Sequence, residues 1–142
     1  MVVLVRLEEV FQPRRGDVFQ LPLGVEQTLP RGCHRVVVIQ GEIANKFSPT
    51  ITVIPLSANS RLKNMLFSAP ITPGGQNGLN KECVALCLQI RTLSRRHFTP
   101  ANFLGSLSEE DMAKIDTILA FTLGLNQKGK TEKMQKTAEF GG

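Results

Sequence analysis

The sequence predicts a β-rich α+β fold, in which one C-terminal amphipathic helix packs on a small, strongly bent β-sheet or partial barrel. Three observations lead to this prediction. Short segments rich in valine, isoleucine and leucine recur between glycine- and proline-containing turns along most of the chain. The apolar spacing changes to a helical period after Leu107. The length of 142 residues suits one domain with a modest core.

The N-terminal part contains a turn–strand–turn unit and then a second, β-branched strand. Residues 1–13 form a lead-in, with VVLV as a short edge strand. Gly16 and Gly24 mark the turns on either side of the first strand. The segments that follow the lead-in are RRGDVFQLPLG, the loop VEQTLPRGC, the strand HRVVVIQ and the connection GEIANKFSPT.

The middle of the chain continues with strands of the same kind. ITVIPLSA is β-branched, and Pro55 within it indicates an edge strand or a bulge. Residues 57–82 are polar and rich in glycine and proline, so we expect a loop around a short strand near Met65 to Ile71. ECVALCLQIRTL then forms one long strand or a bent pair of strands.

A single amphipathic helix completes the predicted domain. Ser108 and Asp111 have the spacing of a capping box, and Gly124 is placed to end the helix. We expect the domain to span residues 14–126 and the polar residues 127–142 to form a flexible tail. The helical stripe consists of Met112, Ile115, Ile118, Leu119, Thr122 and Leu123.

Composition narrows the classes of protein. The sequence has no apolar run as long as a membrane span and no features of a secretion signal, so we expect a cytoplasmic protein. The three cysteines are an odd set, and we interpret Cys83 and Cys87 as buried thiols and not as zinc ligands with His34. We predict no metal or other cofactor. The formal charge of +5 permits an anionic partner such as nucleic acid.

Four segments, in order from about Arg14 to Leu125, resemble the MazF/PemK family of toxins from type II toxin–antitoxin pairs. The resemblance implies a homodimer with an SH3-like barrel, which is also the fold of the gyrase poison CcdB. It implies a ribosome-independent, metal-independent endoribonuclease that cuts single-stranded RNA, often messenger RNA, at a short sequence. The products would carry 2′,3′-cyclic phosphate and 5′-hydroxyl ends, and a cognate MazE-like antitoxin would lay an extended segment across the RNA groove. The segments are RRGDVFQLPLG, HRVVVIQGEIANKFSPTITVIPLSA, ALCLQIRTL and SEEDMAKIDTILAFTLGL.

The resemblance also implies where the catalytic groups lie. Ser57 stands where the family has Thr or Ser, although a serine at a strand end often caps its own loop. His34 and Arg35 replace the family's Arg-Pro pair, and their side chains point to opposite faces of a strand. Either His34 replaces the family arginine, or a bulge near Gly32 returns Arg35 to the cleft. We expect His34 as base or acid and Arg35 as phosphate clamp, the alternative being a solvent-facing histidine without a role.

Further polar residues match the family's substrate-binding segments. Amide and guanidinium groups there would read base edges or hold backbone phosphates. Leu88 stands where the family often has an acidic residue, so the resemblance does not extend to a base preference. We interpret Arg95 and Arg96 as a solvated basic turn. The predicted RNA-binding residues are Arg15, Asn45, Lys46, Gln89, Arg91 and Thr92.

The altered Arg-Pro position leaves two other functions open. One is a CcdB-like poison that acts by binding another protein, and the other is a cleavage-inactive relative that only pairs with an antitoxin. An RNA-cleavage assay in EDTA separates both from the endoribonuclease, because only a metal-independent ribonuclease yields discrete fragments that end in a cyclic phosphate.

Overall fold

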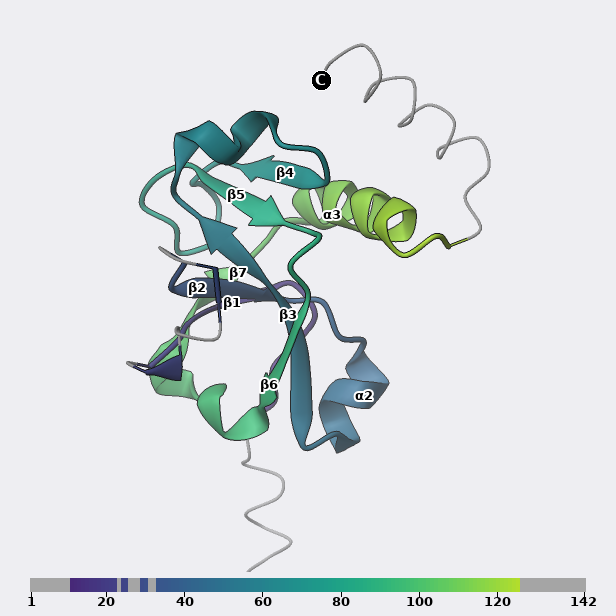
Figure 1. Cartoon of the computed structure of the whole chain (residues 1–142). Helices are drawn as coiled ribbons and strands as arrows, with labels where there is room; N and C mark the ends of the chain where they lie inside the picture. The colour runs from purple at the N-terminus through teal and green to yellow at the C-terminus, as the bar shows by residue number, and fades with distance from the viewer. Residues whose placement is uncertain (1–10, 23, 26–28, 31–32, 126–142) are drawn as a thin grey trace, which may run out of the picture.

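A computed structural model describes residues 11–22, 24–25, 29–30 and 33–125. In this part of the chain a curled antiparallel sheet is covered at one end by helix α3 (Figure 1). The strand order is β4-β5-β3-β2-β1-β7, and β6 also pairs with β3. The prediction of a β-rich partial barrel with a C-terminal helix is confirmed. The elements are β1 (Asp17–Gln20), β2 (Arg35–Val38), α2 (Glu42–Phe47), β3 (Thr50–Ser57), η2 (Ser60–Asn64), β4 (Ser68–Ile71), β5 (Cys83–Leu86), β6 (Arg91–Ser94), η3 (Arg95–His97), η4 (Pro100–Asn102), β7 (Phe103–Ser106) and α3 (Glu109–Thr122).

Strand β3 is the longest strand and connects the two ends of the sheet (Figure 1). Its first residues pair with β6, and its last residues pair with β5. ECVALCLQIRTL therefore forms a bent pair of strands, one of the two predicted alternatives. Pro55 lies where β3 changes partner from β6 to β5, with Val36 of β2 on its other side. The proline thus marks a local gap in one ladder and not an edge strand.

Two apolar clusters lie on opposite faces of this sheet. One joins Val37 and Ile54 to Ile115 of α3, and the other joins Val36 to Phe19. Neighbouring residues of a strand alternate between the faces, so the run VVV supplies both clusters. This arrangement explains why β2 has no polar position between Arg35 and Val38. None of the helices in the described ranges is long and apolar enough to cross a membrane.

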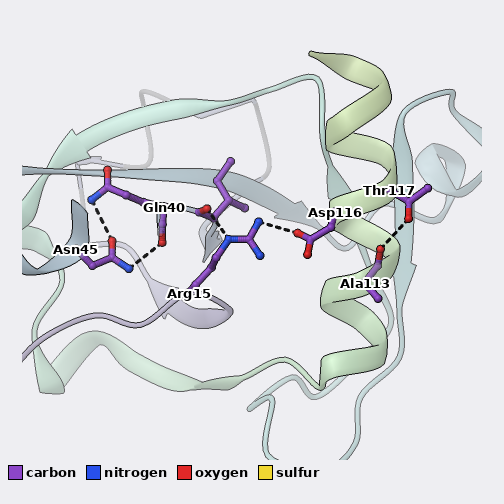
Figure 2. Close-up of polar contacts among 7 residues, drawn as sticks. Arg15, Gln40, Asn45, Ala113, Asp116 and Thr117 are labelled. Carbon is purple, nitrogen blue, oxygen red and sulfur yellow. Dashed lines mark hydrogen bonds and ion pairs between the residues drawn. The ribbon is translucent and has the colours of Figure 1, made fainter. Parts of the chain in front are cut away.

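Helix α2 occupies the segment that was predicted to be a simple connection, and that prediction was wrong. Asn45 is fully buried, and its amide donates to the Gln40 carbonyl oxygen at 2.8 Å and accepts from the Gln40 side chain at 3.0 Å (Figure 2). Arg95 donates to the carbonyl oxygens of Asn45 and Ser48 at the C-terminal end of α2. Arg95 is therefore not part of a solvated turn, because it satisfies carbonyl groups that the helix leaves free.

Helix α3 begins and ends as predicted. The Ser108 side chain accepts from the backbone N–H of Asp111 at 3.1 Å, which caps the first turn. Gly124 has a φ of +68°, the left-handed conformation that commonly follows the last helical turn. The predicted edge strand at VVLV and the predicted tail at residues 127–142 lie outside the described residues.

The three thiols should resist labelling in the folded protein. Burial raises the pKa of Cys33 and Cys83, and it raises the pKa of Cys87 to about 12. The thiolate is the reactive form of cysteine. Because a raised pKa keeps the thiol protonated at a pH where a free thiol is already ionised, these cysteines should react slowly. With a thiol-reactive disulfide at pH 8, we expect Cys87 to react only after denaturation, as intact mass and peptide mapping would report. Rapid labelling of Cys87 in the native protein would contradict this buried placement.

Candidate active site

A cavity of about 300 Å³ lies where several neighbouring strands of the sheet end. In an antiparallel sheet the C-terminal ends of β1 and β3 lie beside the N-terminal ends of β2 and β5. These four strand ends surround the cavity, and both His34 and Arg35 line its wall. The lining residues are Gln20, His34, Arg35, Leu56, Ala58, Lys81 and Cys83.

His34 continues the sheet by one residue before β2 begins. Its carbonyl oxygen accepts from the backbone N–H of Leu21 at 2.9 Å, so the ladder with β1 extends to this position. The β2–β3 ladder begins one residue later, where Arg35 pairs with Leu56, and a continuation of that register would bring His34 opposite Ser57. Arg35 shares the opposite face with Leu56. Both side chains line the cavity, so the choice between His34 and Arg35 as the counterpart of the family arginine stays a prediction, and the bulge expected near Gly32 lies outside the described residues.

Arg35 is half-buried and held by a hydrogen bond. Its Nε donates to Oε1 of Gln20, its ladder partner, at 3.2 Å. The Cys83 thiol lines the same cavity wall. Burial raises the pKa of Cys83, and the positive charge of Arg35 opposes part of that rise. The neutral Gln20 side chain orients the guanidinium at the cavity wall without cancelling its charge.

Ser57 lies under the surface at the end of β3, only 3% exposed. Its Oγ accepts from the backbone N–H of Asn59 at 3.1 Å, which is the local capping contact expected of a serine at a strand end. Burial raises the pKa of the nearby Cys33 thiol, and the Ser57 hydroxyl opposes part of that rise. Leu56 and Ala58, its neighbours in sequence, line the cavity, whereas Ser57 is not among the lining residues.

Arg15, a predicted RNA-binding residue, lies at the opposite end of the β1–β2 hairpin from this cavity. Its Nε donates to the Ile39 carbonyl oxygen at 2.8 Å, and its Nη2 forms an ion pair with Asp116 of α3 at 2.6 Å (Figure 2). Ile39 is four residues beyond Arg35 in the sequence, which is about 13 Å along a strand. Arg15 therefore connects the first turn to α3 and does not line the cavity.

The other predicted RNA-binding residues also lie away from the cavity. Asn45 is buried and both polar atoms of its amide are used. Gln89 accepts from Arg91 at 2.9 Å, and Arg91 pairs with Val53, toward the α2 end of β3. Lys46 and Thr92 are exposed, and the Thr92 hydroxyl lies 3.3 Å from that of Thr52. These residues are thus not part of the cavity wall.

Sequence reasoning missed Gln20 and Lys81 of the cavity wall. The position of Gln20 on the wall results from the pairing of β1 with β2, in which Gln20 is the partner of Arg35. Lys81 lies just before β5, and only the long-range pairing of β5 with β3 places it here. The wall thus carries two cationic side chains, Arg35 and Lys81, and one imidazole. Among the residues that the structure describes, no group of three or more His, Cys, Asp or Glu side chains could hold a metal ion.

The fold resembles several solved structures at low sequence identity. An endoribonuclease from a mycobacterial species matches with a TM-score of 0.62 and 20% identity, over 83% of this chain and 97% of the other. A mycobacterial endoribonuclease in complex with its cognate antitoxin matches at 0.63 and 23%, over 81% and 98%. A MazE–MazF complex from Deinococcus radiodurans matches at 0.61 and 19%, over 82% and 100%. At these identities the matches establish a shared fold.

The family itself follows from the sequence match. A model of the PemK-like, MazF-like toxin of type II toxin–antitoxin systems matches residues 14–123, which is most of the chain. The matched region contains all of the strands and both α-helices described above, including every wall residue of the cavity. The resemblance inferred from the four motif segments is confirmed, and the chain belongs to the PemK-like, MazF-like family of toxins of type II toxin–antitoxin systems.

Proposed function

We propose that this chain is the toxin of a toxin–antitoxin pair and acts as a sequence-specific, metal-independent endoribonuclease on single-stranded RNA, chiefly messenger RNA. The observation that carries the proposal is the cavity in which His34, Arg35 and Lys81 meet. Such a wall offers a group that exchanges protons near neutral pH beside groups that bind phosphate. The family membership and the endoribonucleases among the structures of the same fold support the same activity.

The proposed reaction is an internal transesterification. The 2′-oxygen of a ribose attacks the adjacent phosphorus, the 2′-O–P bond forms, and the bond from phosphorus to the 5′-oxygen breaks. His34 either takes the proton of the 2′-hydroxyl or gives a proton to the leaving 5′-oxygen, and water takes or gives the other proton. Arg35 binds the non-bridging phosphate oxygens, on which negative charge develops. Ser57 supplies a hydroxyl that donates to a phosphate oxygen, for which it leaves its hydrogen bond with the backbone N–H of Asn59.

The proposed partners are a cognate MazE-like antitoxin and a second copy of the toxin, in the cytoplasm. Two of the structures with the same fold are complexes of a toxin with its antitoxin. For the homodimer, Ile43 and Phe47 lie one helical turn apart on α2 and are 79% and 76% exposed. Two large apolar side chains on one face of a short helix favour a protein contact there.

Two observations favour a second candidate function. Ser57 is buried and hydrogen-bonded locally, and the Arg-Pro pair of the family is absent. These features also suit a toxin that acts by binding another protein, or a relative that only binds an antitoxin.

Purified protein, a long unstructured RNA and EDTA decide between these functions. We expect discrete cleavage products with 2′,3′-cyclic phosphate and 5′-hydroxyl ends, because neither the nucleophile nor the proton transfers require a metal. End chemistry is read by mass spectrometry and by the resistance of the 3′ ends to ligation. RNA that stays intact after long incubation with folded protein would refute the endoribonuclease and leave the two binding functions.

A further inference from the structure

Lys81 gives the cavity a second permanent positive charge without a compensating carboxylate. Arg35 and Lys81 both line the cavity, and its wall contains neither Asp nor Glu. Within the described ranges the ion pairs are Arg15 with Asp116 and one within α3, so neither cavity cation has a carboxylate at ion-pair distance. Two charges of the same sign on one cavity wall repel each other, and an anion between them removes that cost.

The fold fixes the position of Lys81 from below. Lys81 lies two residues before Cys83, where β5 starts to pair with β4. The Cys83 thiol, only 3% exposed, donates to the Lys81 carbonyl oxygen at 3.5 Å. The backbone is therefore held against the buried end of the sheet, while the Lys81 side chain is exposed at the cavity mouth. The flexible Lys81 side chain can contact a phosphate in several positions. The guanidinium of Arg35, in contrast, is held in one orientation by its hydrogen bond to Gln20.

A second, smaller hollow continues from this cavity along η2. It shares Ala58 and Cys83 with the cavity, and it is lined further by Asn59, Ser60 and Lys63. Glu82 also lines this hollow, so the positive charge of Lys63 is partly balanced there. The uncompensated charge is confined to the larger cavity, which marks that cavity and not the neighbouring hollow as the anion site.

We propose that Lys81 is a further substrate-binding residue of the RNA site and holds a backbone phosphate next to the one bound by Arg35. The inference rests on the proposed function and assigns to Lys81, which lines the same cavity, a phosphate of its own. An ammonium contributes a point charge that tracks the backbone, and it does not depend on which base is present. Lys81 therefore supplies affinity and register along the strand, while any base preference arises elsewhere.

The test measures how binding depends on salt. The probe is a single-stranded oligonucleotide with 2′-O-methyl groups throughout, which lacks the nucleophile and cannot be cleaved. Loss of one phosphate contact lowers the slope of log K against log[salt] by about 0.7 for a single strand. We expect this change in K81M, a wild-type slope in K81R, and a wild-type slope in K114M. Lys114 is the matched control because it lies on α3, paired with Asp111 at 3.2 Å.

The outcomes separate the two proposals. A K81M slope equal to that of the wild type, in a protein whose thermal unfolding is unchanged, would overturn the role of Lys81. A wild type that binds the probe and leaves ordinary RNA intact would refute cleavage while the Lys81 site stands. Equal losses in K81M and K114M would show a general charge effect and would also refute the site.

Discussion

Replacement of His34 by alanine should lower kcat for RNA cleavage by about 10²–10⁴-fold, the usual contribution of a general acid or base. His34 lines the cavity and continues the β1–β2 ladder by one residue. It is exposed, so its removal creates no void in either apolar cluster. The folded structure should survive the change, and the loss should therefore appear in kcat and not in the free energy of unfolding.

The control for this prediction is His97, the other histidine of the chain. His97 lies in η3, beyond β6 and away from the cavity, so H97A should keep the wild-type kcat. The pH–rate profile of the wild type assigns the role. If the neutral imidazole of His34 takes the 2′-hydroxyl proton, the rate falls as the pH drops; if the imidazolium protonates the leaving oxygen, the rate falls as the pH rises. A flat profile from mildly acid to mildly alkaline pH, or an active H34A, would contradict the assignment.

The fold was predictable because its patterns are local. Alternation, β-branched residues and turn glycines indicate the strands, and Ser108 with Gly124 bounds the last helix. Helix α2 was missed because tertiary contacts stabilise it: Asn45 is buried against Gln40, and Arg95 of η3 donates to its C-terminal carbonyl groups. A helix of six residues carries too little periodicity to be read from sequence.

The candidate site was predictable only where it lies within one hairpin. The choice between His34 and Arg35 depends on register, and one residue of slip exchanges the faces, so sequence alone left both alternatives open. Lys81 depends on the pairing of β5 with β3 across a long loop, which no local pattern specifies. The amide of Asn45 and the guanidinium of Arg15 look the same in sequence whether they bind RNA or the protein itself.

The loop before Lys81 is fixed by a contact between two glycines. A Cβ on Gly105 of β7 would lie 2.1 Å from the Gln76 carbonyl oxygen and 2.8 Å from the backbone nitrogen of Gly78. A Cβ on Gly78 would lie 2.2 Å from the Leu104 carbonyl oxygen. The backbone N–H of Ser106 donates to the Gln76 carbonyl oxygen at 2.8 Å, so the two chains are hydrogen-bonded where they touch. Only residues without side chains permit this approach.

Gly105→Ala should therefore destabilise the protein by about 3 kcal/mol or more, the upper part of the range for overpacking, because the obstructing atoms are backbone and cannot change rotamer. That is a large share of the roughly 5–15 kcal/mol that holds a domain folded. Gly74→Ala is the matched control in the same loop, since its Cβ would meet nothing within 4 Å. Equilibrium urea unfolding measures both.

The destabilisation should reach the cavity, because this loop carries the chain from β4 to Lys81 and Cys83. Asn77, 4% exposed, holds the loop by donating to the Thr72 carbonyl oxygen at 3.0 Å. Movement of the loop off β7 displaces the start of β5, so G105A that is still folded at low temperature should bind the 2′-O-methyl probe with the weaker salt dependence of K81M. The contrary result is a free energy of unfolding for G105A within about 0.5 kcal/mol of the wild type, which is the range of an ordinary surface substitution. It would mean that β7 and the loop separate without cost. The contact with β7 would then not explain the position of Lys81.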